Sequence, residues 1–88
     1  TRFRSGEINL RVADKSAALA RIEAIYRARG AEIDRLDGVT VSFPDWWFNV
    51  RPSNTEPLLR VNIEADTPEL LEQAKQEVLS LLQPDTRS

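Results

Sequence analysis

Four β-prone runs follow one another between residues 33 and 64, separated only by turns and one short polar loop. They cover about residues 33–36, 39–43, 46–50 and 58–64, and the second run alternates strictly between apolar and polar residues. An Asp37-Gly38 pair separates the first two runs, and such a pair is the strongest short signal for a hairpin. Strands joined by short turns must be antiparallel, because a parallel pair needs a long crossover connection. This segment therefore predicts an antiparallel sheet.

One further strand and two helices complete the pattern. Residues 7–12 alternate between polar and apolar side chains, as a half-buried strand does. Asp14 is a suitable cap for a helix over about residues 14–29, and Thr67-Pro68-Glu69 is typical of the start of a second helix that Pro84 ends. The order predicts an α+β fold: an antiparallel β-sheet of four main strands, with a possible short extra strand, and two helices packed on one face.

The chain has 88 residues, enough for one domain and too few for two. It contains no Met, so we expect it to be part of a longer protein. Residues 1–6 are predicted to be a basic, flexible linker from a preceding domain, residues 7–83 the domain itself, and residues 84–88 a frayed tail.

Composition argues against several classes of function. The chain has no His and no Cys, which excludes a zinc site or a thiol nucleophile of the usual kinds. Its net charge of −2 gives no general attraction to nucleic acids or membranes, and no apolar run approaches the ~20 residues of a membrane span. The absence of Cys fits a reducing compartment. We therefore expect a cytoplasmic protein with neither nucleic-acid nor membrane partners.

The polar loop at residues 51–57 differs from the rest of the chain. Arg51 offers a planar fork of donors suited to two phosphate oxygens, and hydroxyl and amide side chains follow it between Pro52 and Pro57. The backbone N–H groups of residues 53–56 would converge on an anion if the loop formed a nest. An ordinary β-turn, with Arg51 paired to Glu56, explains the same residues, and composition alone favours it.

A longer pattern surrounds this loop. Residues 45–60 read DWWFNVRPSNTEPLLR, flanked by SGEIN at residues 5–9 and by LRVNIEA at residues 59–65. This pattern resembles the C-terminal, fourth domain of the α-D-phosphohexomutases, the phosphomannomutase/phosphoglucomutase branch in particular, over nearly the whole chain. The resemblance implies a fold like that of the TATA-box-binding protein. It also implies a mobile domain that grips the non-transferred phosphate of a hexose 1- or 6-phosphate and closes over the active site.

Carried over by position, the resemblance implies substrate phosphate binding by four residues: Arg51, Ser53, Asn54 and Thr55. Arg51 would be the bidentate clamp, with hydroxyl and backbone donors from Ser53 and Thr55 and an amide donor from Asn54. Glu56 and Arg60 are expected to support the loop, with Glu56 bracing either Arg51 or Arg60.

Members of this family move a phosphate reversibly between positions 1 and 6 of a hexose, using a phosphoserine and a magnesium ion. The phosphoserine loop, the magnesium loop and the sugar-specificity loop of the family have no counterpart in this chain. We therefore expect Mg only in the parent enzyme, no cofactor in this chain, and no catalysis by this chain alone. Its partners would be a hexose phosphate substrate and the preceding domains of the same protein.

Several alternatives remain open from the sequence. A stand-alone protein-interaction module would need no phosphate site. The sequence does not distinguish mannose, glucose and glucosamine phosphates. Trp46 and Trp47 should point to opposite faces of their strand, one into the core and the other to a partly exposed position, where packing is favoured over sugar stacking. Asp34 and Asp37 are interpreted as solvated turn residues rather than as an acid–base pair.

Overall fold

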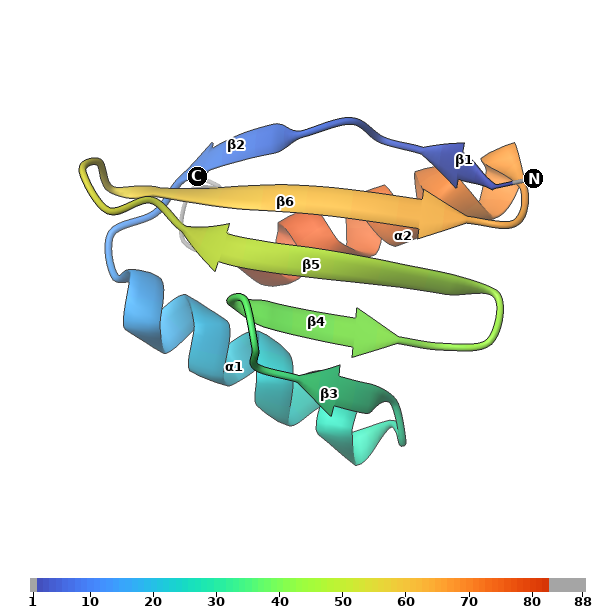
Figure 1. Ribbon diagram of the computed structural model, residues 1–88, viewed down its shortest axis with the longest axis horizontal. Helices are drawn as coiled ribbons and strands as arrows, with labels where there is room; N and C mark the ends of the chain where they lie inside the picture. The colour runs from blue at the N-terminus through green and yellow to red at the C-terminus, as the bar shows by residue number, and fades with distance from the viewer. Residues whose placement is uncertain (1, 83–88) are drawn as a thin grey trace.

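The computed structural model describes residues 2–82 of the chain, and Figure 1 shows how its elements are arranged. In chain order these are β1 (Phe3–Arg4), β2 (Ile8–Arg11), α1 (Lys15–Ala28), β3 (Glu32–Asp34), β4 (Val39–Ser42), β5 (Trp46–Pro52), β6 (Leu58–Ala65) and α2 (Pro68–Leu82). The tail predicted at residues 84–88, and the predicted last residue of the domain at position 83, lie outside the described residues. Neither described helix is both long enough and apolar enough to cross a membrane.

All strands belong to one antiparallel sheet. Its order is β1-β6-β5-β4-β3, and β2 also pairs with β6, so β1 and β2 lie one after the other along the same edge (Figure 1). Both helices lie behind the sheet in that view and pack against each other. The α+β fold class with two helices on one face is therefore confirmed.

The two faces of the sheet differ because side chains alternate along each strand. The residues that face the helices are buried and form the core, among them Val41, Phe48, Val50, Leu59, Val61 and Ile63, together with Ile22 and Tyr26 of α1. The intervening residues of β5 and β6, such as Asn49, Arg51 and Arg60, lie on the other face, which neither α1 nor α2 covers. We call this second side the open face.

Both helices begin where the sequence predicts. The Asp14 carboxylate accepts a hydrogen bond from the Ala17 N–H at 3.0 Å, and the Thr67 hydroxyl accepts one from the Leu70 N–H at 3.0 Å. These caps satisfy amide groups that have no partner within the helix.

Three details of the sheet differ from expectation. The described sheet has six strands, because Phe3–Arg4 in the predicted linker forms the additional strand β1. β5 continues through Pro52, so Arg51 belongs to a strand and not to a loop. The strand predicted up to residue 36 ends at Asp34, and Leu36 is 93% exposed in the hairpin turn. The Asp34 carboxylate accepts a hydrogen bond from the Leu36 N–H at 2.7 Å, so a side-chain turn replaces the end of the strand.

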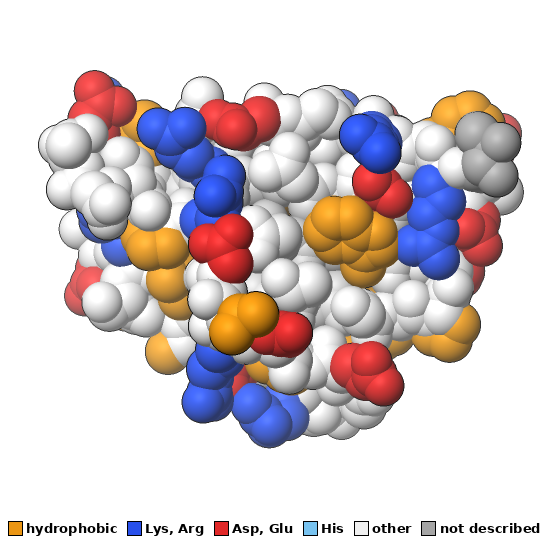
Figure 2. All heavy atoms as spheres, viewed as in Figure 1, with side chains coloured by type: hydrophobic (Ala, Val, Ile, Leu, Met, Phe, Trp, Pro, Cys, Tyr) orange, Lys and Arg blue, Asp and Glu red, His pale blue; other side chains and the backbone are white. Residues whose placement is uncertain are grey.

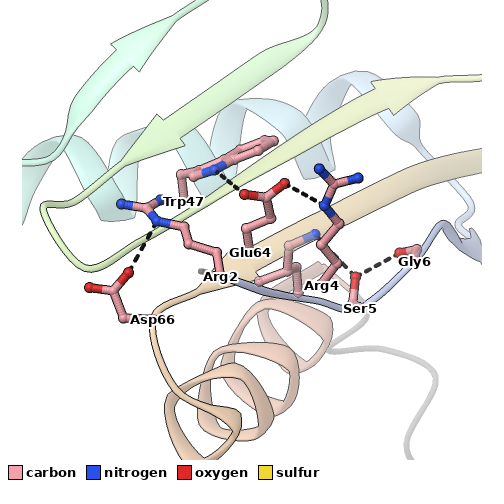
Figure 3. A network of polar contacts seen from close by, with 8 residues as sticks. Arg2, Arg4, Ser5, Gly6, Trp47, Glu64 and Asp66 are labelled. Carbon is pink, nitrogen blue, oxygen red and sulfur yellow. Dashed lines mark hydrogen bonds and ion pairs between the residues drawn. The ribbon is translucent and has the colours of Figure 1, made fainter.

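The N-terminal segment is attached to the sheet (Figure 3). Arg2 forms an ion pair with Asp66 at 3.1 Å, and Arg4 forms one with Glu64 at 3.0 Å. The backbone N–H of Ser5 donates to the Ile63 carbonyl at 2.9 Å. Residues 2–5 are therefore held along β6 and do not form the flexible lead that their composition suggested. Their role as a connection to a preceding domain stays a prediction.

Candidate functional site

A pocket of about 430 Å³ lies on the open face, where β5 leads into the loop at residues 53–57. Asp37 and Gly38 line it from the turn between β3 and β4, residues 51–54 from β5 and the loop, and Arg60 from β6. Figure 2 looks onto this face and shows a group of Lys and Arg side chains toward the end of the sheet that carries the β5–β6 loop, with other such groups elsewhere on the face. The structure thus brings together the predicted residues Arg51, Ser53, Asn54 and Arg60.

Arg51 and Arg60 are directly opposite each other in the pairing of β5 with β6. Like charges at such positions repel each other and destabilise a sheet. An acidic side chain lies beside each arginine. The distance from Nη1 of Arg51 to Oδ2 of Asp37 is 3.6 Å, and that from Nη1 of Arg60 to Oε2 of Glu7 is 3.3 Å. At 3.6 Å the contact between Arg51 and Asp37 is too long for a hydrogen bond, so the guanidinium donors of Arg51 have no hydrogen-bond acceptor among the described residues.

The expected support by Glu56 takes another form. Arg51 and Arg60 pair with Asp37 and Glu7, so bracing of either arginine by the Glu56 carboxylate is wrong for this structure. Glu56 acts through its main chain, whose carbonyl accepts a hydrogen bond from Lys15.

Ser53 is the one buried polar residue in the described part of the chain, at 6% exposure. Its hydroxyl oxygen accepts hydrogen bonds from the N–H groups of Thr55 and Glu56, both at 3.3 Å, and its own N–H donates to the Leu58 carbonyl at 2.9 Å. The predicted nest of backbone donors at residues 53–56 is therefore not formed, because three of its four N–H groups have acceptors within the chain. The N–H of Asn54 has no acceptor among the described residues.

Gly38 packs directly against the strand that carries Arg51. Its φ of +73° is in the left-handed region, and a Cβ placed on it would lie 2.3 Å from the Val50 carbonyl oxygen and 2.8 Å from Cγ of Arg51. The amide of Asn49 donates to the Asp37 carbonyl at 2.8 Å and to the Thr40 hydroxyl at 2.9 Å. The hairpin turn is therefore held tightly beside Arg51.

Sequence reasoning missed three contributors to this site: Lys15, Asp37 and Gly38. The sequence predicts a hairpin at Asp37-Gly38 and a solvated turn residue at Asp37, and nothing local indicates that the turn reaches β5. Lys15 donates to the carbonyls of Ser53 and Glu56 from the start of α1. Its one local signal is a cation at a helix N-terminus, where an anion is favoured.

The two tryptophans lie as the strand pattern predicts. Trp46 is 7% exposed and belongs to the core. Trp47 is half-buried on the open face, and its indole N–H donates to Glu64 at 3.2 Å (Figure 3). This hydrogen bond to a neighbouring strand favours packing over a sugar-stacking role.

Comparison with known proteins agrees with this arrangement. The family model described as "Phosphoglucomutase/phosphomannomutase, C-terminal domain" matches residues 7–81. A phosphomannomutase of Salmonella montevideo is 50% identical over 80 residues, and proteins named phosphohexose mutases in Xanthomonas campestris pv. campestris are 49% identical over 79 residues. Each alignment covers 89% of this chain, which spans only 17% and 18% of the lengths of these relatives.

A solved structure shows the same fold. The crystal structure of a phosphoglucomutase/phosphomannomutase family protein from Burkholderia thailandensis aligns with a TM-score of 0.71 and 24% sequence identity. The alignment covers 97% of this chain and 19% of that protein.

Proposed function

The chain belongs to the phosphoglucomutase/phosphomannomutase C-terminal domain family, and from this premise we propose that the pocket beside Arg51 holds the phosphate of a hexose phosphate. The phosphate held here is the one that is not being transferred. The observation that carries the proposal is the pair of guanidinium groups, Arg51 and Arg60, at opposed positions of β5 and β6 on the wall of one open pocket.

The donors available in the pocket suit a phosphate group. Arg51 can bind two oxygens at once, and its side chain is 41% exposed. Asn54 lines the pocket and adds its side-chain amide and its backbone N–H. Thr55 is exposed in the same loop but does not line the pocket, and its hydroxyl would reach a phosphate only from beside it. A bound phosphate would compete with Asp37 for Arg51, which fits the long separation of that pair. Ser53 contributes by stabilising the conformation of the loop, because its hydroxyl oxygen accepts hydrogen bonds from two backbone N–H groups of that loop.

A longer protein containing this chain would be a phosphohexomutase that moves phosphate between positions 1 and 6 of the sugar. Phosphoryl transfer depends mainly on positioning and charge stabilisation, so holding the idle phosphate orients the reacting end. Residues 2–82 contain no group of three or more acidic side chains placed to hold a metal ion. By the resemblance to the family, the magnesium ion and the phosphoserine would belong to other domains, and this domain would close over the substrate that they act on.

If the pocket is a phosphate site, the affinity of the chain for a ligand should depend on the phosphate group and not on the sugar. We expect inorganic phosphate, mannose 6-phosphate and glucose 6-phosphate to bind the chain with similar, roughly millimolar Kd values, about 4 kcal/mol of binding free energy. Mannose and glucose should not bind. Ligand ³¹P NMR at increasing protein concentration measures the phosphorylated compounds, and saturation-transfer NMR measures the free sugars. Equal binding of mannose and its phosphate would contradict the proposal, and no response to any phosphate would favour an interaction module.

A further inference from the structure

We infer that Lys15 is a positioning residue for the phosphate loop, which it orients from the opposite side of the sheet. This inference rests on the proposed phosphate site. The Lys15 ammonium group donates to the Ser53 carbonyl at 2.5 Å and to the Glu56 carbonyl at 3.0 Å. These two carbonyls bracket Asn54 and Thr55, so a single side chain fixes both ends of the exposed part of the loop.

The place of Lys15 in its helix is unfavourable unless the loop compensates. It is the first residue of α1, next to the Asp14 cap, and the first turn contains no acidic residue. A helix N-terminus carries partial positive charge, which disfavours a cation there. Lys15 is half-buried, and its ammonium group is directed to two carbonyl oxygens of the loop. The contact with the loop therefore explains a residue that helix stability alone does not favour.

Because of the geometry of the peptide unit, the contact between Lys15 and the Ser53 carbonyl also orients a backbone N–H donor. A trans peptide is planar, with its C=O and N–H pointing in opposite directions, and the described residues contain no cis peptide. Because the Ser53 carbonyl points to Lys15, the N–H of the same peptide unit, which belongs to Asn54, points away from Lys15. Helix α1 lies behind the sheet, whereas Arg51 and Arg60 lie on the open face (Figure 1).

The Asn54 N–H is therefore directed toward the side of the loop that carries the pocket. It is also the loop amide with no acceptor among the described residues, and Asn54 lines the pocket. The second contact fixes the other end of the loop without orienting a donor, since the residue after Glu56 is Pro57, which has no N–H. Lys15 does not line the pocket itself, so its effect on a bound phosphate acts through the loop and through its charge.

Lys15→Met tests this role against a matched control, Lys75→Met. Lys75 lies on α2, pairs with Glu72 at 3.9 Å and does not line the pocket, so its replacement removes the same charge without breaking a contact to the loop. We expect Lys15→Met to weaken the binding of inorganic phosphate about fivefold or more, because the loop loses its preorganisation. Lys75→Met should bind within about twofold of the unaltered chain. Lys15→Arg, which keeps the charge and several donors, should recover most of the lost affinity.

The amide signal of Asn54 provides a readout that a general loss of stability does not produce. It should shift in unliganded Lys15→Met and return toward its original position in Lys15→Arg. If Lys15→Met does not fold, the unaltered chain still tests the contact, because scalar coupling between the Lys15 ammonium nitrogen and the Ser53 carbonyl carbon should be observed.

Each outcome decides a different part of the account. If the unaltered chain binds phosphate and Lys15→Met binds equally well with an unchanged Asn54 signal, the role of Lys15 is overturned while the phosphate site stands. Absence of the scalar coupling also overturns it. If the unaltered chain does not bind phosphate, the proposed function fails, and the role of Lys15 fails with it.

Discussion

Replacing Arg51 with alanine is expected to weaken phosphate binding by at least about tenfold, since charge-assisted hydrogen bonds to one guanidinium contribute roughly 1.5–3 kcal/mol. The fold should survive the change. Arg51 lies on the open face opposite Arg60, and its nearest acidic partner is 3.6 Å away, so its removal relieves a repulsion as well as breaking a weak pair. Affinity for inorganic phosphate, measured by ³¹P NMR, therefore reports on the site and not on folding.

Two further variants separate charge from geometry. Arg51→Lys keeps the positive charge but loses the bidentate fork, so its affinity should lie between those of the unaltered chain and Arg51→Ala. Arg27→Ala removes the same charge from α1, where Arg27 pairs with Glu23, and should leave binding unchanged. Phosphate binding by Arg51→Ala that equals that of the unaltered chain would remove Arg51 from the site.

Gly38→Ala is expected to lower the free energy of unfolding by about 2–5 kcal/mol, because two costs add at this position. The left-handed φ of +73° is unfavourable for alanine, and its Cβ would lie 2.3 Å from a backbone oxygen of β5 that has little room to move. Relief of the clash would require the turn to move away from Val50 and Arg51. We therefore also expect weaker phosphate binding by the folded fraction of this variant.

Gly30→Ala is the matched control for this loss of stability. Its φ of +84° is equally unfavourable for alanine, but a Cβ at that position would have no atom within 4 Å. Gly30→Ala is expected to lower the free energy of unfolding by only about 1–2 kcal/mol, because only the backbone conformation is unfavourable. Urea denaturation of the three proteins measures the difference, and equal costs for the two substitutions would show that the contact with β5 is unimportant.

Much of this fold is predictable from sequence because its signals are local. Alternation marks the strands, Asp14 and Thr67 mark the helix starts, and Asp37-Gly38 marks the hairpin. β1 is different, since Phe3–Arg4 is too short to show alternation. This strand depends on partners about 60 residues away, such as Asp66 for Arg2 and Glu64 for Arg4.

Part of the lining of the pocket was predictable from the sequence, but the geometry of the pocket was not. The resemblance indicated Arg51 and Asn54, and the structure places both at one pocket. Ser53 is buried, and its hydroxyl oxygen accepts two backbone hydrogen bonds. Both features depend on how the loop packs against β6, which the composition of the loop does not reveal. The contact of Lys15 with the loop joins residues 38 positions apart, so only the folded chain shows it.

Amide chemical-shift mapping tests the central claim, phosphate binding at residues 51–55, most directly. In a ¹⁵N-labelled chain titrated with mannose 6-phosphate, the largest shifts are predicted at Arg51, Ser53, Asn54 and Thr55, with Asn54 foremost because its N–H has no acceptor among the described residues. These shifts should disappear in Arg51→Ala. An unchanged loop at tens of millimolar ligand, or shifts confined to residues outside the pocket, would contradict the account.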